Sequence, residues 1–157
     1  MFLTVHASAG VLIGHYAKNI WLAFILGFIS HFILDAIPHG DENLIIDKAD
    51  ITKKEIMKVL ALASSDGLVM LSVLGLLYMS GQFELTPSII AAVIGTILPD
   101  VFNGIYMVTK FSWFEKFSHW HFQAHYIFKK YLVSLSTGLV IQFLTVTSLI
   151  IILIIAK

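Results

Sequence analysis

A histidine and an aspartate four residues apart, His31 and Asp35, lie inside a strongly apolar segment of the chain. On a helix, residues at this spacing share one face. Ionisable groups are costly to place in hydrocarbon, and where they occur they usually mark a functional site. An imidazole and a carboxylate on one face can offer a nitrogen and an oxygen ligand to a metal ion. We therefore expect this pair to anchor a metal site.

Two more aspartates, Asp66 and Asp100, interrupt other apolar segments. Three carboxylates that come together repel one another, and their pKa values rise unless a cation lies among them. A divalent metal meets that condition, and His6 in the first apolar segment could add a further nitrogen. We predict His6, His31, Asp35 and Asp100 as metal ligands and Asp66 as a ligand or general base. Two alternatives stay open: Asp66 as a hydrogen-bonded helix cap, and a proton relay built from the same residue types.

A third group of candidates lies in a histidine-rich segment near residue 120. His121 and His125 are four residues apart and can face one way on a helix, whereas His119 cannot share the face of His121. We expect His121 and His125 to act in catalysis or to contact a substrate phosphate, with His119 in a secondary role. The alternative is an amphipathic interfacial helix whose aromatic and histidine side chains lie among lipid headgroups.

His39 and Asn103 complete the candidates in secondary roles. His39 follows Pro38, which should end the helix that carries His31, and Asn103 lies three residues beyond Asp100 on the same helical face. The chain contains no cysteine, which excludes thiolate ligands and disulfides. A set of histidines and aspartates suits Zn²⁺, and also Mn²⁺ or Fe²⁺.

The composition indicates what must position these residues. Of 157 residues, 58% are hydrophobic and 13% are charged, against ~25% charged in a soluble protein. Residues 132–156 contain no charge at all, and roughly 20 apolar residues suffice to cross a bilayer. We predict an all-α, polytopic membrane bundle that forms a single domain over residues 1–157. It has about five spans and a short interfacial helix at 117–126; the spans cover about 3–16, 20–37, 59–79, 88–108 and 132–156.

Local signals refine these elements. Gly10 and Gly14 fit the small-residue motif through which membrane helices pack closely. Thr52 and Glu55 have the spacing of a capping box at the start of the third helix. The run from Ser64 to Gly67 is expected to interrupt that helix, and Pro99 is expected to kink or open the fourth.

The lysines predict an orientation in a prokaryotic cytoplasmic membrane. With five spans, eight lysines fall on one side, and only Lys18 and Lys157 fall on the other. The positive-inside rule then places the N-terminus in the cytoplasm and the C-terminus outside. The candidate ligands all fall in the cytoplasmic leaflet, with His15 as the exception. The formal net charge is zero and there is no basic run, so nucleic acid is not expected as a partner.

Three short segments together resemble the membrane-bound metal-dependent hydrolases, small polytopic prokaryotic proteins similar to zinc-dependent phospholipase C. They are HASAG from His6 to Gly10, SHFILD from Ser30 to Asp35 and GTILPD from Gly95 to Asp100. The resemblance implies that His6, His31, Asp35 and Asp100 bind a metal or lie close to it. The chain departs from the family where Asn103 stands in place of an acid. The family's His-Arg-Gly-x-Thr-His segment has only an analogue, in residues 119–125.

These observations lead to one functional hypothesis and one alternative. The hypothesis is a membrane-embedded, metal-dependent hydrolase that acts on a phosphoester or lipid-like substrate near the cytoplasmic leaflet. Membrane lipid is then both its surroundings and a source of substrate. The alternative is a non-enzymatic membrane protein, either an ion or proton translocator or a structural partner subunit. The sequence leaves the oligomeric state open.

Overall fold

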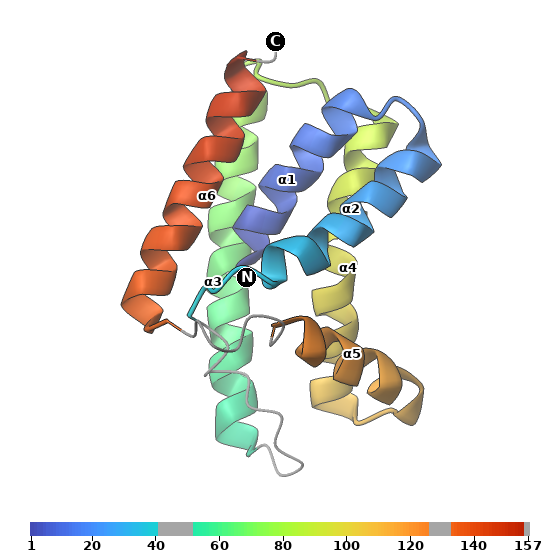
Figure 1. Cartoon of the computed structure of the whole chain (residues 1–157), viewed down its shortest axis with the longest axis vertical. Coiled ribbons are helices and arrows are strands. Elements are labelled where there is room, and N and C mark those ends of the chain that lie inside the picture. Colours follow the sequence, from blue (N-terminus) through green and yellow to red (C-terminus); the bar gives the residue numbers. More distant parts are fainter. Residues whose placement is uncertain (41–51, 126–132, 156–157) are drawn as a thin grey trace.

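The fold is described from a computed structural model, for residues 1–40, 52–125 and 133–155. Over these residues the secondary structure is helical, without strands (Figure 1). The elements, in chain order, are α1 (Leu3–Tyr16), α2 (Ile20–Asp35), α3 (Lys53–Met79), α4 (Pro87–Thr109), a 3₁₀ turn (Ser112–Phe114), α5 (Glu115–His125) and α6 (Leu135–Ile155). The predicted all-helical fold is confirmed for this part of the chain.

Helix α4 packs against both α1 and α2, and glycines allow the close approach. A Cβ atom added at Gly10 of α1 would lie 2.7 Å from the Val93 Cα atom of α4, and one at Gly14 would meet the backbone of Ile89. On the other side of α4, a Cβ atom at Gly95 would meet the Phe24 carbonyl oxygen of α2. The close-packing role predicted for Gly10 and Gly14 is therefore confirmed.

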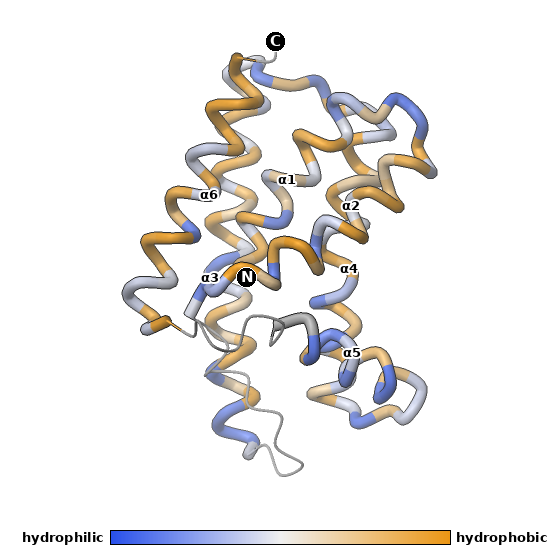
Figure 2. Tube along the Cα trace, in the orientation of Figure 1, coloured by the Kyte–Doolittle hydropathy of each residue, from blue (hydrophilic) through white to orange (hydrophobic). Residues whose placement is uncertain are grey.

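Within the described residues, three helices are long and apolar enough to cross a membrane: α3, α4 and α6. Helices α1 and α2 have 14 and 16 residues and are shorter than a full span. Figure 2 shows hydrophobic residues along most of α3 and α6, with hydrophilic residues at the N-terminal end of α3 and on α5. Three of the five predicted spans thus have spanning length.

The helix boundaries follow local signals in most places. Helix α2 ends at Asp35, two residues earlier than predicted and before Pro38. The capping box at the start of α3 is present, because the Thr52 hydroxyl accepts from the Glu55 N–H while the Glu55 carboxylate accepts from the Thr52 N–H. Helix α4 continues through Pro99.

The interruption predicted at Ser64–Gly67 is wrong, since α3 runs unbroken from Lys53 to Met79. The Ser65 hydroxyl donates to the Ala61 carbonyl within the same helix, so it does not compete with the helical backbone. The Asp66 carboxylate binds Thr4 of α1: it accepts hydrogen bonds from the Thr4 hydroxyl at 2.6 Å and from the Thr4 N–H at 3.2 Å. A hydrogen bond within α3 therefore satisfies Ser65, and a tertiary contact with α1 satisfies Asp66.

Helix α5 lies where the short interfacial helix was predicted, with bounds shifted by one or two residues. It packs against the C-terminal half of α4 and against α2. This placement brings the histidine-rich segment to the two helices that carry the other candidate ligands.

Candidate metal centre

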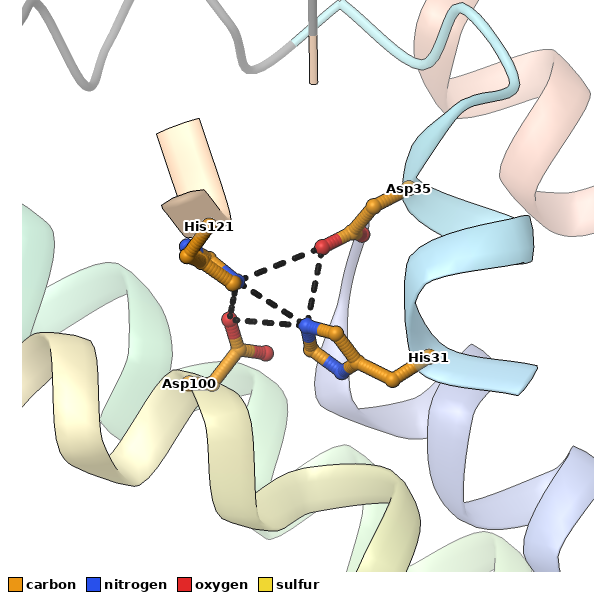
Figure 3. Close-up of side chains that lie close together, drawn as sticks. All are labelled: His31, Asp35, Asp100 and His121. Atoms are coloured by element: carbon orange, nitrogen blue, oxygen red, sulfur yellow. Dashed lines mark hydrogen bonds and ion pairs between the residues drawn. The ribbon is translucent and has the colours of Figure 1, made fainter. Parts of the chain in front are cut away.

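Four side chains from three helices converge on one point (Figure 3). His31 and Asp35 come from α2, Asp100 from α4 and His121 from α5, and one ligand atom from each lies within 4.8 Å of all the others. The side chains of His31, Asp35 and His121 are at most 1% exposed, whereas that of Asp100 is 26% exposed. The site is therefore closed on three sides and accessible at Asp100.

Five of the six distances between the four ligand atoms lie between 2.9 and 3.9 Å, and all six are within 4.8 Å, near the edge lengths of tetrahedral coordination. The Nε2 atom of His31 lies 2.9 Å from both Asp35 Oδ2 and His121 Nε2 and 3.9 Å from Asp100 Oδ1. The Nε2 atom of His121 lies 3.4 Å from Asp35 Oδ2 and 3.3 Å from Asp100 Oδ1. A tetrahedron with zinc–ligand bonds of 2.0–2.2 Å has edges of about 3.3–3.6 Å. Small side-chain movements would bring the four atoms onto such a tetrahedron.

The imidazole of His31 is oriented by α4. Its Nδ1–H donates to the Thr96 carbonyl oxygen at 2.7 Å, and the side chain is fully buried. That bond fixes the proton on Nδ1 and leaves the lone pair on Nε2, which faces the other three ligand atoms. Histidines that bind metals almost always donate their second ring N–H to a carbonyl or carboxylate in this way.

The imidazole of His121 is held by the two carboxylates. Burial alone would lower the pKa of His121, but hydrogen bonds to Asp100 and Asp35, together with the charges of these carboxylates, outweigh it. They raise the pKa to about 9. The group thus favours a positive charge between the two carboxylates, and a divalent cation would provide that charge at the meeting point of all four ligand atoms.

His6 lies beside the group and contacts its carboxylates. Its Nε2 atom is 3.1 Å from Asp35 Oδ1 and 4.0 Å from Asp100 Oδ2, and its ring stacks on His31 with centroids 4.2 Å apart. The N-terminal amine of Met1 also donates to Asp35 Oδ1. Asp35 therefore has one oxygen held by α1 and the other facing the imidazoles. His6, which we predict as a ligand, lies beside the four converging residues, and its Nε2 atom contacts the carboxylates of Asp35 and Asp100.

Two further predicted residues connect neighbouring helices. Asn103 is buried and accepts the Ser118 hydroxyl at 2.7 Å, which ties α4 to α5. Asp66 binds Thr4 and ties α3 to α1, and it lines the same cavity as Asp100. Neither belongs to the group of four converging residues.

The remaining candidates, His39, His119 and His125, are not among the four converging residues. His39 is fully buried, and its Nδ1–H donates to the Ile37 carbonyl oxygen at 2.6 Å. His119 is exposed and pairs with Gln123 on a different face of α5 from His121, as the spacing predicted. The side chain of His125 is outside the described part of the structure. His121, which we predict as a catalytic group, is one of the four converging residues.

The sequence analysis missed two positioning residues. Thr96 offers a backbone carbonyl, which no sequence pattern reveals. Gln142 of α6 is buried, donates to the His39 carbonyl at 3.0 Å and accepts from the Phe2 N–H at 2.7 Å. It is the one amide in the uncharged segment 132–156, and a polar side chain in such a segment is a usable signal.

Comparisons of the chain with known protein families, with curated proteins and with solved structures find no match.

Proposed function

We propose that the protein is a membrane-embedded, metal-dependent hydrolase that acts on a phosphoester or lipid-like substrate. The observation that carries the proposal is the convergence of two imidazole nitrogens and two carboxylate oxygens within 4.8 Å of one another. Such a donor set suits Zn²⁺, with Mn²⁺ or Fe²⁺ as alternatives. A divalent ion bound there would supply Lewis-acid chemistry, activating water and polarising a phosphoryl or acyl oxygen.

The chain's own residues would divide the remaining work. The three enclosed residues, His31, Asp35 and His121, would hold the metal ion and fix its position. Asp100 is partly exposed and would lie on the side from which a substrate approaches. His6 and Thr96 keep Asp35 and His31 in position. Asp66 and His125 remain our predictions for a proton-transferring group, with Asp66 favoured by its place on the cavity that Asp100 lines.

For the membrane topology we propose the five-span arrangement, with α1 and α2 as short spans. The N-terminus is then cytoplasmic, the C-terminus is outside, and the metal centre lies in the cytoplasmic leaflet of a prokaryotic membrane. A reporter fused after Asp47 should read as cytoplasmic. A periplasmic reading would reverse the orientation.

Metal analysis of the purified protein tests the function. Wild-type protein should retain about one equivalent of zinc after gel filtration, and the variants His31→Ala and Asp35→Ala should lose it, because each removes a ligand. His119→Ala is the matched control, since that histidine is exposed and lies outside the group. Wild type without bound metal, after incubation with Zn²⁺, Mn²⁺ and Fe²⁺ in turn, would refute the hydrolase proposal.

A further inference from the structure

A cavity of about 270 Å³ lies between α3 and α4, and Met1, Phe2 and Leu3 also line it. Most of its lining is apolar. The apolar wall residues from the two helices include Val59, Leu60, Ala63, Val101, Gly104 and Met107, and the polar groups are Asp66, Asp100 and Asn103. The cavity is therefore apolar along its length and polar at specific points.

Asp100 connects this cavity to the metal centre. Its carboxylate is 3.3 Å from His121 Nε2, and the residue also lines the cavity. Of the four converging residues it alone is substantially exposed. Asp100 is therefore the residue through which the cavity meets the group of four.

The walls of the cavity are two helices of membrane-spanning length. Helix α3 packs mainly against α1 and meets α4 only slightly, and Asp66 is its one buried residue. Leu60 and Val101, on opposite walls, are 39% and 46% exposed. In a bilayer, side chains exposed on spanning helices face lipid, so the cavity opens toward acyl chains rather than toward water.

From this arrangement we propose that the α3–α4 cavity binds one alkyl chain of a membrane lipid and so presents the lipid's phosphoester to the metal centre. This proposal rests on the proposed hydrolase function only for the chemistry at the phosphoester end of the lipid. The apolar walls fit a hydrocarbon chain, and Asp100 with its partners lies where the polar end would be. The volume is below the roughly 300–1,000 Å³ of pockets that enclose a whole drug-sized ligand, which favours one chain over an entire lipid.

Photocrosslinking tests the inference with a defined probe. Zinc-loaded protein in phosphatidylcholine nanodiscs is irradiated with dodecyl phosphate that carries a diazirine at mid-chain, and the labelled residues are mapped by mass spectrometry. Labels should concentrate on the cavity walls of α3 and α4. Excess unlabelled dodecyl phosphate should displace them, whereas butyl phosphate, with the same polar end and a short chain, should not.

Gly104 offers a variant that fills the cavity without disturbing the fold. A Cβ atom at Gly104 meets nothing within 4 Å, so Gly104→Leu projects into the cavity without a backbone clash. It should lower wall labelling by about tenfold, because the added side chain takes the place of about two methylene groups of the bound chain and so removes their apolar burial. Gly75→Leu is the matched control, because Gly75 on α3 also has open space and does not line the cavity.

Zinc retention, measured on the same samples, separates the two proposals. Retained zinc in every sample, with labelling lost only in Gly104→Leu, would support the chain site. Labelling spread over all lipid-facing helices and unchanged by Gly104→Leu would overturn the chain site and leave the metal centre standing. Displaceable labelling of the walls in protein that binds no metal would support the chain site and refute the hydrolase proposal.

Discussion

Ser118 of α5 donates its hydroxyl hydrogen to the Asn103 side-chain oxygen of α4 over 2.7 Å. On each helix the metal-centre residue lies three positions away, His121 beyond Ser118 and Asp100 before Asn103. Residues at this spacing share a helical face. The bond between Ser118 and Asn103 therefore lies alongside the contact between His121 and Asp100 and sets the distance between the two helices.

Removing this bond should weaken the metal centre without removing a ligand. Ser118→Ala removes the buried hydrogen bond between α5 and α4, and it leaves the Asn103 side-chain oxygen without the Ser118 donor. We expect zinc affinity to fall by about 10–100-fold, as for other residues that orient metal ligands. Competition with a fluorescent zinc chelator measures it. Ser72→Ala is the control, because the Ser72 hydroxyl bonds only within its own helix, and an equal loss in both variants would contradict a positioning role for Ser118.

His6 should act on the metal through Asp35. Its Nε2 atom lies 3.1 Å from Asp35 Oδ1, which also accepts from the Met1 amine, so His6→Ala removes one of the two contacts that hold this oxygen and leaves all four converging residues in place. We expect weaker binding of Co²⁺ by about 10–100-fold, with the visible absorption spectrum of tetrahedral cobalt unchanged.

A changed cobalt spectrum in His6→Ala would show that His6 binds the metal directly, as the sequence analysis predicted. His15→Ala, on the other histidine of α1 and outside the group, serves as the control.

Metal affinity should decrease as the pH falls. The pKa of His121 is raised to about 9 in the metal-free protein, so at neutral pH its imidazole carries a proton that a metal must displace. Each pH unit below 9 should then lower the apparent zinc affinity by about tenfold for that proton. Chelator competition at several pH values between 6.5 and 8.5 measures the slope, with His119→Ala as the control. A flat profile would exclude His121 as a ligand.

The sequence predicts well what depends on spacing within one helix. His31 and Asp35 share a face because they are four residues apart, and the capping box at Thr52 depends on residues three apart. The spacing of Gly10 and Gly14 predicts a close helix contact without specifying which helix is the partner. Each of these predictions uses helical periodicity, which the sequence contains in full.

What the sequence could not supply is which helices meet. His121 and Asp100 are ligand neighbours because α5 folds back onto α4, and no local pattern specifies that approach. His6 looked equivalent to His31, yet the packing of α1 places it against the outer oxygen of Asp35. The sequence around Asp66 predicts a break in α3, but the Asp66 carboxylate is hydrogen-bonded to Thr4 of α1 and the helix is continuous. Tertiary packing decided all three cases.

The glycine contacts of α4 give a stability prediction. A Cβ atom at Gly10 would lie 2.7 Å from Val93 Cα and 2.9 Å from Val93 N. These are backbone atoms that cannot rotate away, so Gly10→Ala must push α1 from α4. We expect a destabilisation of about 1–3 kcal/mol, as for other overpacked cores, measured as the free energy of unfolding in mixed micelles of increasing dodecyl sulfate content.

Gly67→Ala is the matched control, since a Cβ atom at Gly67 on α3 meets nothing within 4 Å. It replaces a helical glycine without a clash and should stabilise the protein by roughly 0.5–1 kcal/mol. Because α1 carries His6 and α4 carries Asp100, Gly10→Ala should also lower zinc affinity, whereas Gly67→Ala should leave it unchanged. Equal free energies of unfolding for the two variants would mean that α1 and α4 are not in close contact, and the positions of His6 and Asp100 would then need to be revised.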